Sequence, residues 1–87
     1  GNGNVHVNIL FDKTDEAESE RAIAAMSQVF TCTTGLGGQL SGEHGIGLAK
    51  RDFMTHAIDA PTLALMRDIK RCMDPLGILN PGKILPP

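Results

Sequence analysis

Large aromatic side chains are almost absent from this sequence. None of its 87 residues is Trp or Tyr, and three are Phe: Phe11, Phe30 and Phe53. A hydrophobic core must therefore be built from Leu, Ile, Val, Met and Ala. A chain of this length can form at most one small domain, and such domains are often marginally stable without a disulfide, a metal or a partner.

The sequence also lacks a large excess of positive or negative charge, and it lacks long apolar runs. The net charge is −2, and the eight Lys and Arg residues form no basic stripe and have no aromatic residues between them. This composition argues against nucleic acid as a partner. No apolar run is long enough to cross a membrane, and no signal peptide is present. We therefore expect a cytoplasmic protein.

Cysteine is limited to Cys32 and Cys72, which do not form a CxxC pair. We expect two free thiols, buried or half-buried, in a reducing compartment. A disulfide between the two remains an alternative.

The N-terminal segment alternates in polarity, which predicts a β-strand over residues 5–11. One face carries apolar residues that would point to a core: Val5, Val7, Ile9 and Phe11. The opposite face places Asn4, His6 and Asn8 side by side. Three polar groups in this arrangement are either solvated or line a site.

Two helices are predicted downstream. Thr14 or Asp15 can be the N-cap of a helix that runs to about Thr33 or Thr34, and if Asp15 is the cap, Glu18 stands at the capping-box position. Asp59 and Pro61 mark the start of the second helix, which ends before Pro75. A short strand is expected around residues 39–41, and the connection over residues 48–58 is left undecided between helix and irregular structure. The order strand, helix, strand or loop, helix and extended tail predicts part of an α+β domain with antiparallel strands.

A glycine-rich segment in the middle of the chain carries two polar residues with catalytic potential. Residues 41–47 read SGEHGIG, and the glycines permit close approach of other groups to Glu43 and His44. Together with His6, these residues offer imidazole and carboxylate ligands suited to Zn²⁺, Mn²⁺ or Fe²⁺. The alternative is that His6 is an exposed residue and that Glu43 and His44 form a solvated turn.

Three segments, taken in order, resemble a known family. They read GNGNVH over residues 1–6, SGEHGIG over residues 41–47 and DPLGILNPGK over residues 74–83. The pattern is similar to the C-terminal part of FAD-linked oxidases of the vanillyl-alcohol oxidase type. That group includes D-lactate dehydrogenases, the D subunit of glycolate oxidase and D-2-hydroxyglutarate dehydrogenases. The resemblance covers essentially the whole chain.

The resemblance implies a role for five residues. His6 and Glu43 match ligands of a divalent metal (Zn, Mn or Fe) in the metal-dependent members, and Asn8 matches a contact to the substrate carboxylate. His44 matches the base that accepts the hydroxyl proton, and Asn80 matches a residue that touches the flavin. The implied reaction oxidises a 2-hydroxy acid and passes a hydride to FAD.

The resemblance also implies a domain organisation. Residues 1–87 would form the C-terminal part of a ferredoxin-like cap or substrate domain, including a flavin-contacting tail over residues 74–87. Because Gly1 stands inside a motif, we expect an FAD-binding domain upstream in a longer protein. The fragment alone would be inactive, and the intact enzyme could be peripheral to the inner membrane or a homo-oligomer.

The sequence departs from the family pattern at two points. The family usually has Asp where this chain has Asn2. It also has a further His ligand at a position that falls before Gly1, so the chain would hold only part of a metal site. Two other interpretations stay open: a non-catalytic module that binds a divalent metal through His6, Glu43 and His44, and a purely structural or oligomerising fragment.

Overall fold

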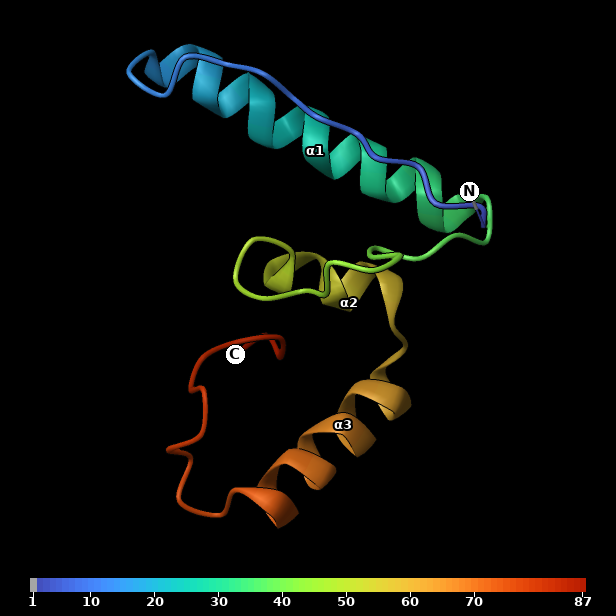
Figure 1. Ribbon diagram of the computed structural model, residues 1–87, viewed down its shortest axis with the longest axis vertical. Coiled ribbons are helices and arrows are strands. Elements are labelled where there is room, and N and C mark those ends of the chain that lie inside the picture. The colour runs from blue at the N-terminus through green and yellow to red at the C-terminus, as the bar shows by residue number, and fades with distance from the viewer. Residues whose placement is uncertain (1) are drawn as a thin grey trace.

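The computed structural model describes residues 2–87, and Gly1, the first residue of the N-terminal motif, lies outside the described residues. This part of the chain is helical (Figure 1). Its elements, in order, are α1 (Glu16–Gly35), the short 3-10 helix η1 (Arg51–Phe53), α2 (Met54–Ala57) and α3 (Ala60–Met73). None of these helices is long and apolar enough to cross a membrane.

The predicted α+β, ferredoxin-like fold is wrong for this chain, because residues 2–87 contain no strand. Residues 5–11 are irregular rather than part of a sheet, and residues 39–41 are irregular with a bend at Leu40. Asp12 bonds to Glu18 at the start of α1, while Asn4 packs on Gly42 beyond its end. The segment between therefore runs back along α1 (Figure 1). The backbone N–H and C=O groups of a helix bond to each other within the helix. They are therefore not available to form β-sheet hydrogen bonds with a neighbouring extended segment.

The first helix begins where the sequence predicts. The backbone N–H of Glu18 donates to Asp15 Oδ1 over 3.0 Å, so Asp15 is the N-cap. The carboxylate of Glu18 accepts from the backbone N–H of Asp12 over 2.8 Å rather than from that of Asp15. In a capping box the side chain of Glu18 would accept from the backbone N–H of the N-cap, Asp15; here it accepts from Asp12, three residues earlier. The helix ends at Gly35, one residue beyond the predicted end, with Leu36 as C-cap.

The third helix also has the predicted start. The backbone N–H of Thr62 donates to Asp59 Oδ1 over 2.8 Å, and Pro61 lies in the first turn, where its missing N–H costs nothing. These hydrogen bonds from Thr62 hold the pKa of Asp59 below its usual value. The helix runs to Met73, and Asp74 follows as the C-cap residue.

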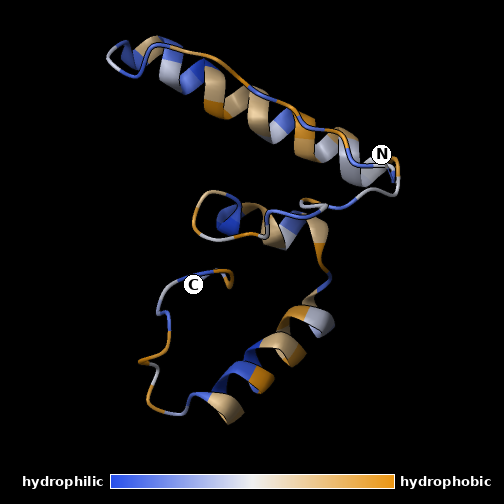
Figure 2. Ribbon diagram, viewed as in Figure 1, coloured by the Kyte–Doolittle hydropathy of each residue, from blue (hydrophilic) through white to orange (hydrophobic). Residues whose placement is uncertain are grey.

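The core is small and lies where the helices meet. Leu40, Met54 and Leu63 are buried together, and Phe30 packs against Phe53 with ring centroids 4.7 Å apart. Other apolar residues stay on the surface, and Figure 2 shows them spread over α1, α3 and the N-terminal segment. Val5 and Val7, which were predicted to point to a core, are exposed, and so are Leu65, Ile69 and Met73 on α3.

The C-terminal tail is not extended, in contrast to the prediction. Residues 75–85 form a series of turns and bends that curl back toward the middle of the chain (Figure 1). The backbone N–H of Ile84 donates to the carbonyl of Gly47 over 2.9 Å, which fixes the tail beside the glycine-rich loop. Both cysteines are free, as expected, but Cys32 and Cys72 are exposed rather than buried.

Candidate functional site

The N-terminal segment and the glycine-rich loop lie in contact. The side chain of Asn4 lies directly over Gly42, where a Cβ atom would be 2.2 Å from Asn4 Oδ1. The rings of His6 and His44 meet edge to face, with centroids 5.5 Å apart. Two of the three motifs found in the sequence therefore form one surface.

The loop itself is shaped to expose its polar residues. The backbone N–H of Gly45 donates to Ser41 Oγ over 2.7 Å, and Gly45 and Gly47 have φ of 78° and 56°, which favour glycine. The side chains of Glu43 and His44 project outward from this turn and are about two-thirds exposed. Glu43 Oε1 lies 3.4 Å from His44 Nε2, so a protonated His44 has a carboxylate partner.

The tail brings the third motif to the same loop. Arg51 Nη1 donates to the carbonyl of Gly82 over 3.0 Å, which adds to the bond between Ile84 and Gly47. A shallow concavity of about 450 Å³ lies between the loop and the tail. His44 lines it from the loop, and Asn80 and Lys83 line it from the tail. We call it the His44–Asn80 concavity.

Asn8 belongs to the same surface through His6. His6 Nε2 and Asn8 Oδ1 are 3.1 Å apart, so the amide oxygen is engaged by the imidazole. The amide nitrogen of Asn8 is then left as a donor for another group. The five residues singled out in the sequence are thus linked: Asn8 to His6, His6 to His44, His44 to Glu43, and His44 to Asn80 across the concavity.

The described residues do not form a complete metal centre. No group of three or more His, Cys, Asp or Glu side chains within residues 2–87 is arranged to hold a metal ion. His6 and His44 stand edge to face, and Glu43 reaches His44 rather than a shared point with both rings. This arrangement supplies partial ligation at most, since a catalytic metal in a protein usually has three protein ligands.

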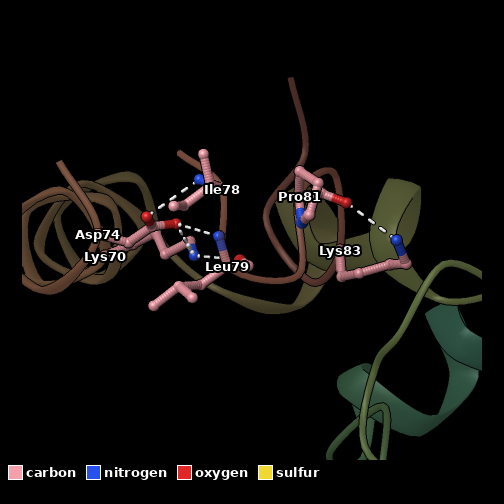
Figure 3. Close-up of polar contacts among 6 residues, drawn as sticks. All are labelled: Lys70, Asp74, Ile78, Leu79, Pro81 and Lys83. Atoms are coloured by element: carbon pink, nitrogen blue, oxygen red, sulfur yellow. Dashed lines mark hydrogen bonds and ion pairs between the residues drawn. The ribbon is translucent and has the colours of Figure 1, made fainter. Parts of the chain in front are cut away.

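The sequence prediction missed two contributors. Lys83 lines the concavity, and its position directly after the Asn80 turn is the signal that could have identified it. Asp74 lies buried at the end of α3 and binds Lys70 and the backbone of residues 78 and 79 (Figure 3). The bond from Lys70 and the backbone N–H donors hold the pKa of Asp74 below its usual value, against the opposing effect of desolvation.

Comparison with known proteins identifies a shared family. The family described as "FAD linked oxidases, C-terminal domain" matches residues 1–84. No solved structure matches the chain.

Curated relatives agree with that match. The chain is 38% identical to the D-lactate dehydrogenase of Anaerostipes hadrus over 85 residues, which is 97% of this chain and 18% of the relative. It is 41% identical to the mitochondrial D-2-hydroxyglutarate dehydrogenase of Bos taurus over 87 residues, 99% of this chain and 15% of that protein. It is 37% identical to the glycolate oxidase subunit GlcD of Escherichia coli K12 over 86 residues, 99% of this chain and 17% of that subunit. The chain spans less than a fifth of the length of these relatives.

Proposed function

The chain belongs to the family of FAD-linked oxidase C-terminal domains, and from this premise we propose that it forms the substrate-facing part of an FAD-dependent 2-hydroxy-acid dehydrogenase. The names of its relatives support D-lactate, glycolate or D-2-hydroxyglutarate as the class of substrate. The observation that carries the proposal is the position of His44, which touches His6 and Glu43 on one side and shares a concavity with Asn80 on the other.

Oxidation of a 2-hydroxy acid removes two hydrogens from one carbon and its oxygen. The hydroxyl loses a proton, the same carbon loses a hydride, and a C=O bond forms to give the 2-oxo acid. FAD, when bound, supplies the hydride acceptor that no side chain can provide. The part left to this chain is to hold the acid and to take the proton.

His44 is suited to take that proton. Imidazole titrates near neutral pH, so it can accept a proton from the hydroxyl and release it to solvent afterwards. Once protonated, His44 carries a positive charge at a position where Glu43 Oε1 is 3.4 Å from Nε2. The carboxylate therefore stabilises the imidazolium that the reaction forms.

Asn8 and Asn80 serve to place the two reacting molecules. The Oδ1 atom of Asn8 is paired with His6, so its amide nitrogen is available to donate to the substrate carboxylate. Asn80 lies across the concavity from His44, and we assign to it the contact to the flavin. This arrangement would put the substrate between the base and the hydride acceptor.

A divalent metal would draw on His6 and Glu43 in this proposal. Within residues 2–87 these donors are not joined by a third one at the same point. No step of the reaction is therefore assigned to a metal.

The surface of the chain supports a large partner, which we propose to be the FAD-binding part of the same polypeptide. A compact protein of this mass exposes about 5000 Å², whereas this chain exposes 6772 Å². A compact chain of this length has a radius of gyration of about 12 Å, whereas this one has 14.9 Å. The excess area exceeds the ~800 Å² that one partner buries in a standard interface.

The experiment is a pair of histidine substitutions in the full-length flavoprotein. We expect His44→Gln to lower the turnover number about 10²- to 10⁴-fold, as loss of a general base does. The matched control is His56→Gln, because His56 is exposed on α2 and does not line the concavity. Both are measured by steady-state turnover with the substrate of the wild-type enzyme. Equal turnover numbers for the two variants would remove His44 from the role of base.

A further inference from the structure

Asp74 is the one buried charged residue among residues 2–87, and each of its carboxylate oxygens is engaged. Oδ1 accepts from the backbone N–H of Ile78 over 3.1 Å, and Oδ2 accepts from that of Leu79 over 3.0 Å. Lys70 Nζ donates to Oδ2 over 2.6 Å and to the carbonyl of Leu79 over 2.6 Å. Figure 3 shows these four bonds gathered at one point, where α3 meets the tail.

The bonded backbone directly precedes the residue that faces the concavity. Leu79 is held by both Asp74 and Lys70, and Asn80 follows it with φ of 46°, in the left-handed region. Beyond Asn80 the tail is fixed again, by Arg51 at Gly82. The segment that carries Asn80 is thus fixed on both sides.

We propose that Asp74, assisted by Lys70, is a positioning residue that fixes the turn over residues 75–80 so that Asn80 faces the His44–Asn80 concavity. Asp74 does not touch this concavity itself, since it is absent from the lining. It acts through the backbone of Leu79. The inference rests on the proposed function, because Asn80 is there the contact to the flavin.

The chemistry of the site requires a carboxylate. An ionised carboxylate only accepts hydrogen bonds, so its two oxygens can satisfy two backbone N–H groups and an ammonium at once. An amide of the same size has one oxygen and one NH₂ group, and the NH₂ would face an N–H donor. Asp74→Asn therefore keeps the volume and loses at least one of the two backbone bonds.

The test uses the full-length flavoprotein and two isosteric substitutions on α3 or at its end. Asp74→Asn removes the carboxylate that is proposed to fix the turn over residues 75–80. Asp68→Asn is the matched control, because Asp68 is exposed and pairs with Arg71 on its own helix. Three quantities are measured: amide hydrogen exchange at Ile78 and Leu79, flavin content, and the anaerobic rate of flavin reduction per bound flavin.

We expect Asp74→Asn to accelerate exchange of the two amides at least tenfold and to lower the reduction rate about 10- to 100-fold, as a small misplacement of a reacting group does. Flavin content should stay near that of Asp68→Asn, which should match the wild type in all three measurements. A merely structural role would instead lower the flavin content and leave the rate per bound flavin unchanged. That result, or unchanged amide exchange, overturns the proposal.

Lys70→Met keeps the proposal testable if Asp74→Asn does not fold. It leaves the carboxylate bonds to Ile78 and Leu79 in place and removes both bonds from Lys70 Nζ, one to Asp74 Oδ2 and one to the Leu79 carbonyl. We expect smaller changes in exchange and reduction rate in the same direction, and wild-type values would contradict the proposal. If no 2-hydroxy acid reduces the wild-type flavin, the proposed function fails, whereas the exchange measurement still decides whether Asp74 holds the turn.

Discussion

At the scale of single residues, the tail contains two side-chain-bearing positions with left-handed backbone. Asn80 has φ of 46° and Ile84 has φ of 67°. Asn tolerates this conformation, but a β-branched residue rarely adopts it. The strain at Ile84 is held by its bond to Gly47. Such strain concentrates at functional sites, which fits the position of both residues beside His44.

Replacing Asn80 by Gly and by Ala separates its backbone role from its side-chain role. Asn80→Gly keeps the left-handed turn and removes the amide, so we expect flavin to bind about fivefold to tenfold more weakly, the effect of one lost hydrogen bond. Asn80→Ala also removes the amide, and in addition strains the turn by roughly 1–2 kcal/mol. The flavin dissociation constant of the full-length protein is the measurement. A wild-type constant for Asn80→Gly would show that the amide makes no contact with the flavin.

The sequence predicted some residue roles and missed others for a physical reason. Asp59 is correctly predicted as a helix cap, and Asp15 is the correct one of the two candidates, Thr14 and Asp15, because a cap bonds to N–H groups two or three residues away along the chain. Asp74 was passed over, since Pro75 and Gly77 already explain the end of the helix. Its burial depends on how the tail folds over α3, which local pattern does not specify.

At the scale of elements, the alternation in residues 5–11 predicted a strand and was misleading. Val5 and Val7 are more than half exposed, and the segment lies along α1 (Figure 1). Alternation indicates that one face of an extended segment is apolar and can pack against another element. It does not specify whether that element is a sheet or a helix. The contact between His6 and His44 joins two segments distant in sequence. It was suggested by the metal-ligand chemistry of these residues and by the family resemblance, and not by the alternation.

Helix α3 has an ionised carboxylate at each end, and this makes its stability depend on pH. Hydrogen bonds from Thr62 lower the pKa of Asp59, and those from Lys70 and the backbone lower the pKa of Asp74. A folded-state pKa below the unfolded value means that the unfolded chain binds protons first as pH falls. The stabilisation is therefore complete at neutral pH, declines below about pH 4, where unfolded Asp titrates, and is lost below the folded-state values.

Carboxyl NMR titration of Asp59 and Asp74 in the folded protein checks this account. We expect both midpoints to fall below about 3.9, the usual value for Asp. Helicity followed by circular dichroism should decline as pH falls through the same range, and not as it rises. A midpoint above 3.9 for Asp74 would mean that desolvation outweighs the bonds from Lys70 and the backbone.

At the scale of the whole molecule, the small core supports the proposal that this chain packs against a partner. Five apolar residues are buried within residues 2–87: Ala22, Leu40, Met54, Leu63 and Pro86. The exposed positions Leu65, Ile69 and Met73 recur at helical spacing on α3 and continue into Leu76 and Ile78. The low aromatic content and short length predicted a small core from the sequence. They could not predict which face would stay open, because that follows from how α3 and the tail pack.

The central claim is that this chain belongs to a flavoprotein that oxidises a 2-hydroxy acid, and one spectrum tests it. The full-length protein is placed under anaerobic conditions and its visible absorption is recorded before and after addition of D-lactate, glycolate and D-2-hydroxyglutarate. We expect a bound flavin whose absorption band bleaches with at least one of the three acids. A protein that is colourless and cannot be reconstituted with FAD, or a flavin band that none of the acids bleaches, would contradict the claim.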